Sequence, residues 1–307
     1  MPKVSVIAVT ARLGCFDVLV NCMEAQTFPK GDFEVVVVDS FYEERKDFVI
    51  DRLPKNFRHI GLPEDRPWYD ACYANNVGTR EAQGELLIYF CDLNWAYPDF
   101  VKDHWDVYRT VPGHSMTGYC DRFPIPLLKT GRLGPGFERP EDAYDWADVA
   151  WSIFFDEFTS KFAEWYFNSV EPSYRERKGG IIPSEPTELP SVAPEMTFYE
   201  LPADKWYGSL NESIPKAVVE ECNGWNEAMD GAYGVADVDL GVRANLAGWK
   251  FLVKLDSINR KLGQKSDSGI IPARNKPQTR TLADNWRLFE EMKASGRWRV
   301  PDGSGLK

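Results

Sequence analysis

The chain has 307 residues, of which 43% are hydrophobic, so it can bury the core of one large α/β domain or two small ones. It carries 47 acidic and 36 basic residues, and the formal net charge of -11 repels nucleic-acid phosphates and anionic lipid heads. The composition therefore excludes a disordered chain and makes nucleic acid a disfavoured partner.

Short apolar runs alternate with helical patterns in the first third of the chain. Apolar runs of strand length cover residues 4–9, 33–38, 57–62 and 86–91. Apolar residues at helical spacing lie between them, after Gly14 and over 48–53 and 69–83. Such alternation predicts a Rossmann-like, mostly parallel sheet with helices on both faces. Ligands bind at the carboxyl ends of these strands, where Asp39 and Asp92 stand.

Residues 120–205 interrupt this alternation. They contain a predicted aromatic and acidic helix over 144–167 and then a proline-rich stretch, which is typical of a binding loop or lid. Regular structure resumes with a predicted helix over 238–246, a strand over 249–255 and an amphipathic helix over 282–294.

No apolar run approaches the ~20 residues of a membrane span, and no charged and apolar leader precedes the first predicted strand. We therefore expect a cytoplasmic protein without an integral membrane segment. The six cysteines are scattered without a CxxC pair, so we expect buried free thiols.

Four motifs follow one another in the amino-terminal half. They are Ser5-Val-Ile-Ala-Val-Thr10, Glu34-Val-Val-Val-Val-Asp39-Ser40, Ala74-Asn-Asn76-Val-Gly78 with Ala82 and Gly84, and Leu87-Ile-Tyr-Phe-Cys-Asp92-Leu-Asn94. Their order and spacing resemble those of the family 2 glycosyltransferases, which have the GT-A fold. The resemblance implies an α/β, GT-A architecture that binds a nucleotide sugar.

A second block of motifs resembles the galactosyltransferase-like carboxy-terminal module of the same family. It comprises Gly208-Ser-Leu-Asn211-Glu-Ser-Ile-Pro215, Cys222-Asn-Gly224-Trp-Asn-Glu227, and Gly234-Val-Ala-Asp237-Val-Asp239-Leu with Arg243 and Ala247-Gly248-Trp249. We therefore divide the chain into four parts. They are a nucleotide-sugar-binding half (1–119), an insertion that forms a lid or binds the acceptor (120–205), an acceptor-binding and catalytic half (206–255), and a basic loop with a carboxy-terminal helix (256–307).

The resemblance implies that one set of side chains binds the nucleotide, with a UDP-sugar favoured as donor. These side chains are Thr10, Arg12, Asp39, Asn76, Arg80 and Asp92. Asp92 and Asn94 occupy the metal-binding DxD position, where oxygen ligands hold Mn²⁺ or Mg²⁺. An amide carries no charge, so Asn94 predicts a weak metal site. The alternative for each strand-end carboxylate is that it only caps the following helix.

Basic residues are concentrated between Arg243 and Arg280, with nine basic against two acidic side chains. This segment could close over the diphosphate as a lid, or it could be a solvated basic loop.

Asp237 is the candidate catalytic base by the same resemblance, although Ala236 replaces the Glu that usually precedes it. It would remove the proton of the acceptor hydroxyl as that oxygen attacks the anomeric carbon, and inversion is the family expectation. The alternative is that Asp237 and Asp239 only favour the amino terminus of a helix. Side chains expected to contact the donor or acceptor sugar are Asn211, Trp225, Asn226, Glu227 and Asp239.

The Gln-x-x-Arg-Trp signature of processive synthases is absent, which favours transfer of a single sugar.

Two other functions remain open from the sequence. A nucleotidyltransferase would also need a parallel-sheet nucleotide pocket, but it has no reason to keep the block from Gly224 to Trp249. A catalytically degenerate nucleotide-sugar-binding scaffold is suggested by Asn94 and Ala236.

Overall fold

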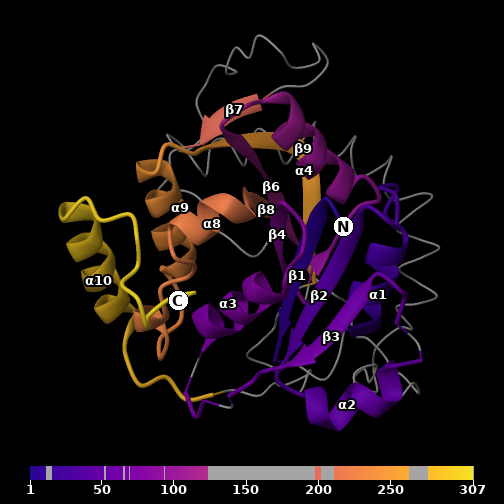
Figure 1. The fold of residues 1–307 in the computed structure, drawn as a ribbon, viewed down its shortest axis with the longest axis horizontal. Coiled ribbons are helices and arrows are strands. Elements are labelled where there is room, and N and C mark those ends of the chain that lie inside the picture. Colours follow the sequence, from indigo (N-terminus) through magenta and orange to yellow (C-terminus); the bar gives the residue numbers. More distant parts are fainter. Residues whose placement is uncertain are drawn as a thin grey trace.

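The computed structural model describes residues 1–11, 16–51, 53–64, 66–68, 70–92, 94–123, 198–201, 211–262 and 276–306. The amino-terminal half contains β1 (Val4–Thr10), α1 (Phe16–Glu24), β2 (Phe33–Asp39), α2 (Tyr42–Val49), β3 (Phe57–Gly61), α3 (Ala71–Glu81), β4 (Leu86–Cys91), β5 (Asn94–Trp95), α4 (Phe100–Thr110) and β6 (His114–Phe123) (Figure 1). The remainder contains β7 (Phe198–Leu201), β8 (Glu212–Pro215), α8 (Lys216–Glu221), η4 (Glu227–Met229), α9 (Ala236–Leu246), β9 (Lys250–Leu262) and α10 (Leu282–Ala294).

One sheet joins the nine strands of the described residues, in the order β3-β2-β1-β4-β8-β6-β9-β5, with β7 paired to β9. The first four of these strands pair in parallel. Strand β8 is antiparallel to both β4 and β6, and β6 is parallel to β9, so β6 and β9 run in the direction of β1. Six of the nine strands thus share one direction, and the predicted mostly parallel α/β sheet is confirmed.

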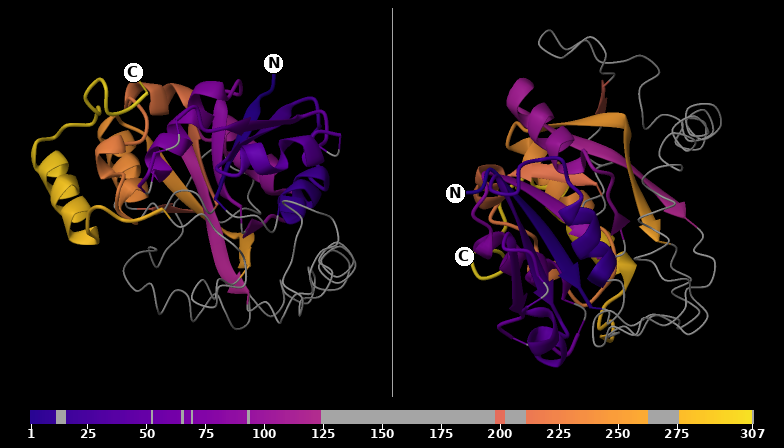
Figure 2. Two further views of the ribbon diagram at one scale, coloured as in Figure 1. Left: turned by 90° about the horizontal axis from the view of Figure 1, so that it is seen from below. Right: turned by 90° about the vertical axis from the view of Figure 1, so that its right-hand side faces the viewer.

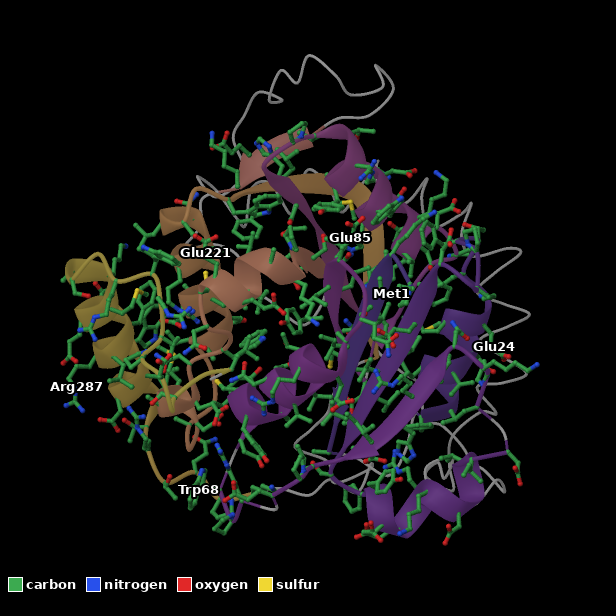
Figure 3. All side chains as sticks on the ribbon, in the orientation of Figure 1. Met1, Glu24, Trp68, Glu85, Glu221 and Arg287 are labelled. Atoms are coloured by element: carbon green, nitrogen blue, oxygen red, sulfur yellow. The ribbon has the colours of Figure 1, made fainter. Side chains whose placement is uncertain are left out.

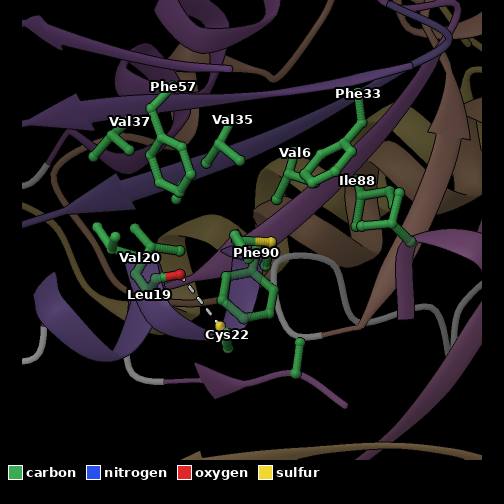
Figure 4. Packing of buried hydrophobic residues seen from close by; sticks show 14 of the residues in the cluster. Val6, Leu19, Val20, Cys22, Phe33, Val35, Val37, Phe57, Ile88 and Phe90 are labelled. Carbon is green, nitrogen blue, oxygen red and sulfur yellow. Dashed lines mark hydrogen bonds between the residues drawn. The ribbon is translucent and has the colours of Figure 1, made fainter. Parts of the chain in front are cut away.

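Helices cover both faces of the sheet because successive side chains of a strand point to opposite sides. In β1, Val4, Val6 and Ala8 pack against α1 and α4, and the same core includes side chains of β2 and β4 (Figure 4). Ile7 faces the other side and joins the core that includes Tyr89 and side chains of α3, α8, α9 and α10. Helix α10 lies at the end of the molecule opposite to α1, as Figure 1 and the left view of Figure 2 show.

Helix α2 differs from its prediction. It spans Tyr42–Val49, whereas apolar spacing predicted a helical segment over 48–53. The helix is anchored by Arg45, whose fully buried side chain pairs with Asp39, and by Val49. Ile50, which would continue the apolar pattern, is exposed. Arg45 is buried through an ion pair and does not contribute to the spacing of apolar residues. Hydrophobic spacing therefore predicted the start of this helix too far along the chain.

The described part of the chain contains no helix that could cross a membrane, and its longest helix, α10, has 13 residues. Helix α10 has the predicted bounds, and α9 begins two residues before its prediction. Cys22, Cys72 and Cys222 are buried free thiols, as predicted, and Cys91 is free and partly exposed. The predicted helix over 144–167 and the prolines after it lie outside the described residues.

Gly84, in the turn between α3 and β4, offers a test of the packing of this half of the fold. A Cβ atom at Gly84 would lie 2.6 Å from the backbone nitrogen of Ser5 and from the carbonyl carbon of Val4, so the backbone must move to admit it. We predict that Gly84→Ala lowers the free energy of unfolding by about 1–3 kcal/mol, measured by urea denaturation. Gly31→Ala is the matched control, because a Cβ there meets nothing within 4 Å. Equal urea midpoints for the two variants would contradict the prediction.

Candidate functional site

Three of the predicted nucleotide ligands meet at the carboxyl edge of the sheet. Asp39 is the last residue of β2 and stands in register with Thr10, the last residue of β1. Asp92 directly follows β4, and its Oδ2 accepts a hydrogen bond of 2.9 Å from Thr10 Oγ1. All three side chains are buried. The parallel strands therefore bring together residues that lie more than 80 positions apart in the sequence.

Asp39 is held by partners that the sequence did not reveal. Its Oδ2 lies 2.8 Å from Nε2 of His59 and 3.1 Å from Nε of Arg45. Its Oδ1 accepts the backbone N–H of Phe41, the N-cap residue of α2, at 2.8 Å. The alternative, that Asp39 only caps the following helix, is not observed: the N-cap of α2 is Phe41, and no side chain caps this helix. The Arg45 guanidinium stacks 5.0 Å from the ring of Phe16, which places a buried cation beside this carboxylate.

The other predicted nucleotide ligands are placed differently. Arg12 lies outside the described residues. Arg80 is exposed in the last turn of α3. Because α3 runs back from the carboxyl edge of the sheet to the start of β4, Arg80 stands at the opposite edge from Asp39 and Asp92, and the structure does not bring it to them. Asn94 is fully buried in β5, opposite Lys261 of β9.

Asn76, in the middle of α3, fastens residues 222–227, which we call the Asn-Gly-Trp turn. Its Oδ1 accepts the backbone N–H of Trp225 at 2.8 Å, and its Nδ2 donates to the carbonyl oxygen of Trp225 and to Oε1 of Glu227, both at 2.9 Å. Gly224 in this turn has φ of +78°, and a Cβ there would lie 2.5 Å from Asn76 Oδ1. Glycine is therefore required at this position by both its backbone angle and the close approach of α3.

Glu227 extends this contact to a residue that the motifs did not include. Its Oε2 pairs with Nη1 of Arg66 at 2.9 Å, and the Arg66 guanidinium lies 3.7 Å from the centre of the Tyr73 ring. Asp230, a few residues on, accepts the backbone N–H groups of Cys72 and Tyr73 at 2.8 and 3.1 Å, and burial raises its pKa to about 7. Glu227 and Asp230 thus bind the first turn of α3 and the loop before it.

The predicted sugar contacts other than Glu227 are largely internal. Trp225 is buried with its ring edge to face against Tyr89, at 5.0 Å between centroids. Asn226 caps η4 by accepting the N–H of Ala228. Asn211 is fully buried, bonded through Oδ1 to His104 Nε2 at 3.0 Å and through Nδ2 to the carbonyl of Ser257 at 2.9 Å. A contact between these side chains and a sugar stays a prediction.

The two carboxylates at the start of α9 have different surroundings. Asp239 is fully buried and pairs with Arg243 Nε at 2.7 Å, and the same guanidinium donates to the carbonyls of Cys222 and Gly224 at 2.9 and 2.8 Å. Asp237 is half-buried, and its Oδ1 accepts the backbone N–H of Val238 at 3.0 Å. Burial raises the pKa of Asp237 to about 6, with no contribution from a charged side chain.

The turn before Asp237 has an uncommon backbone. Gly231, Gly234 and Val235 have φ of +89°, +93° and +76°. A positive φ is rare for a β-branched residue, and such backbones persist where the surrounding structure holds them, often at functional sites. Asp237 therefore stands two residues after a position of local strain.

The basic residues between Arg243 and Arg280 do not form one free cationic segment. Arg243 and Lys254 are buried, and Lys254 forms an ion pair of 2.7 Å with Asp103. For these two residues, both predicted roles, a lid over the diphosphate and a solvated basic loop, are therefore wrong. Lys276 pairs with Asp70 at 2.7 Å, at the N-cap of α3. The sequence count could not separate cations that are buried in ion pairs from cations that are free to bind phosphate.

The described residues offer few ligands for a divalent cation. Within the described residues no three His, Cys, Asp or Glu side chains are grouped so that they could hold a metal ion. Asp92 offers one carboxylate at the strand edge. Mg²⁺ in nucleotide sites is commonly bound by one or two carboxylates, with phosphate and water oxygens completing the shell. Asp92 and a bound diphosphate would therefore suffice.

A scan against models of protein families finds no match, and a search of curated proteins finds none. Solved structures are similar in fold. S. aureus TarS has a TM-score of 0.52 at 15% identity, over 94% of this chain and 39% of its own. GalNAc-T7, solved with UDP, GalNAc and Mn²⁺, has 0.54 at 14%, over 85% and 43%. The mannosyltransferase PcManGT from Pyrobaculum calidifontis, solved with GDP-Man and Mn²⁺, has 0.51 at 14%, over 96% and 63%.

The chain thus spans between 39 and 63% of the length of these three proteins. All three are GT-A glycosyltransferases. The chain has the GT-A fold.

Proposed function

We infer that this protein is a glycosyltransferase that moves one sugar from a nucleoside-diphosphate sugar, with a UDP-sugar favoured, to an acceptor hydroxyl. The observation that most supports this function is Asp237: a half-buried carboxylate without a charged partner in the described structure, at the amino terminus of α9, in a GT-A fold. The ligands of two proteins of similar fold support the substrate class, since one was solved with GDP-Man and the other with UDP and GalNAc. Membership of family 2 and a cytoplasmic location remain predictions from the sequence.

Asp237 acts in this proposal as the general base. Its carboxylate accepts the proton of the acceptor hydroxyl while that oxygen forms a bond to the anomeric carbon of the donor. The bond between the anomeric carbon and the diphosphate oxygen breaks at the same time, on the opposite face, so the configuration inverts. A pKa of about 6 suits this role, because the group is deprotonated at neutral pH and still basic enough to take a proton.

The departing diphosphate develops negative charge that must be offset. Asp92, oriented by Thr10, would hold Mn²⁺ or Mg²⁺ beside the diphosphate, and such an ion stabilises the leaving group electrostatically. Thr10 and Asp39 would bound the nucleoside side of the site, and Asn76 would keep the acceptor side next to it through the Asn-Gly-Trp turn.

A catalytically degenerate scaffold is the second candidate. It is favoured by Asn94, which is buried, and by the lack of a complete metal-ligand group within the described chain. Such a protein would bind nucleotide sugars without turning them over, so a turnover assay separates the two candidates.

Incubation of the protein with a panel of nucleotide sugars and acceptors is the direct test of function. We predict release of free nucleoside diphosphate together with a glycosylated acceptor. In the Asp237→Asn variant, the rate should fall by about 10²–10⁴, because the general base is lost, while nucleotide affinity stays near that of the wild type. Pyrophosphate release would indicate a nucleotidyltransferase, and binding without turnover a scaffold. Full activity of the variant would remove Asp237 from the mechanism.

The pH profile tests the protonation state of Asp237. Its raised pKa of about 6 means that the carboxylate is present above this pH and is neutralised as the pH falls through it. We predict that kcat/KM is level near neutral pH and decreases below pH of about 6, by about tenfold per unit. A profile that stays level down to pH of about 4 would contradict a base with this pKa.

Asp92 is expected to be the one protein carboxylate at the metal. We predict that Asp92→Asn weakens Mn²⁺-dependent binding of UDP by about tenfold or more, since a charged ligand to the ion is lost. Isothermal titration with UDP, with and without Mn²⁺, measures this. Asp32→Asn is the control, because Asp32 is a surface carboxylate paired only with Lys3. An identical Mn²⁺ effect in both variants would show that Asp92 does not face the ion.

A further inference from the structure

Residues 228–234 form the loop that precedes Asp237, and we call them the Asp237 loop. They are held by a segment about 50 positions further along the chain. Carbonyl oxygens of this loop accept hydrogen bonds from residues 279–285 at five positions. The acceptors are Ala228, Met229, Gly231, Ala232 and Gly234. The backbone N–H groups of Thr279 and Arg280 both reach Gly231, at 2.8 and 3.0 Å, and the Arg280 guanidinium reaches Ala228.

Asn285, on α10, supplies three of these bonds. Its Nδ2 lies 3.0 Å from the carbonyls of Met229 and Gly234 and 3.5 Å from that of Ala232. The side chain is fully buried, whereas Arg287, two residues on, points outward at the edge of the molecule (Figure 3). A capping box of Thr281 and Asp284 fixes the start of α10 and so the place of Asn285.

The backbone at the end of this loop has an uncommon conformation. The positive φ angles of Gly231, Gly234 and Val235 lie within and just after the part that Asn285 grips, and Val235 is the N-cap of α9. Glycine adopts a positive φ readily, but Val235 is β-branched, and such a residue keeps a positive φ only where neighbouring contacts hold it. Without the amide of Asn285, the carbonyls of Met229 and Gly234 would each lose a partner, and the loop could relax to ordinary backbone angles.

We propose that Asn285 is a positioning residue for the reaction: by clamping the Asp237 loop it fixes the start of α9 and aims the carboxylate of Asp237. The proposal rests on the function proposed above, in which Asp237 is the base. Asn285 does not touch the reacting atoms. The segment after β9, which the sequence offered only as a basic loop and a last helix, thus becomes part of the catalytic half.

The test compares variants at two positions of α10 in the full chain. Asn285→Ala removes the clamp, and Asn285→Ser is a second variant that keeps one short donor if the alanine variant does not fold. Phe289→Leu is the control, because Phe289 is buried on the same helix but donates no hydrogen bond to the loop. All are assayed well below their melting temperatures for kcat, donor KM and the pH profile of kcat/KM.

We expect Asn285→Ala to lower kcat by about 100-fold, the size of effect of a catalytic group displaced by roughly 1 Å, with donor KM little changed. The acid limb of its pH profile, which is the decrease of kcat/KM at low pH, should move to lower pH. It should move from the wild-type pKa of about 6 toward the ordinary aspartate pKa of about 3.9, because a relaxed loop exposes Asp237 to water. Phe289→Leu should lower the melting temperature while leaving kcat and the limb unchanged.

Wild-type kcat and an unmoved acid limb in the Asn285 variants would overturn the proposal, and so would an equal loss of kcat in Phe289→Leu. Failure of the proposed function gives a different result. In that case Asp237→Asn retains transfer, or the wild type shows no acid limb, whatever the Asn285 variants do.

Discussion

The buried amide of Asn76 joins the two halves of this molecule. It lies on α3, which packs against the parallel half of the sheet, and it binds both the N–H and the carbonyl of Trp225 in the other half. A buried polar group left without its partner costs about 1–3 kcal/mol, so the two halves cannot separate at this point without a penalty. The Asn-Gly-Trp turn therefore fixes the position of α9 relative to the strand-end carboxylates.

Two other elements hold the same turn from different sides. Arg243 of α9 donates to the carbonyls of Cys222 and Gly224 from the interior. The carboxy-terminal tail binds it from outside, where Asn223 Nδ2 donates to the carbonyl of Val300 at 2.9 Å and the N–H of Leu306 donates to the carbonyl of Asn223 at 3.0 Å. Several independent hydrogen bonds thus fix the conformation of the turn, as a preorganised site requires. The cost is a buried arginine, whose charge is compensated by Asp239.

The sheet and its edge could be predicted from the sequence because they depend on local patterns. Apolar runs of strand length lie at β1, β2, β3 and β4, and the carboxyl ends of parallel strands necessarily share an edge, so Thr10, Asp39 and Asp92 meet there. Helix α10 was predictable to its last residue because it is amphipathic and opens with a capping box. These signals are contained in windows of about 10–20 residues.

The contacts that hold the site could not be predicted in this way. His59 on Asp39, Arg66 on Glu227, and Asn285 on the Asp237 loop join residues that are distant in the chain, through polar bonds without a period. Arg45 is near Asp39 in the chain, but their ion pair gives no periodic signal either. Arg80 was misplaced because its position in a motif says nothing of which edge of the sheet its turn of helix faces. Asn211 and Trp225 match family motifs, yet their side chains are buried among protein groups.

In the proposed reaction, the strand-end carboxylates and Asp237 serve one donor site. A crystal structure of the protein with UDP and Mn²⁺ tests it most directly. We expect the diphosphate at the carboxyl ends of β1 and β4, with the ion on Asp92 and the carboxylate of Asp237 facing the same cleft. Nucleotide density elsewhere on the protein, or an Asp237 side chain that faces away from the bound nucleotide, would contradict it.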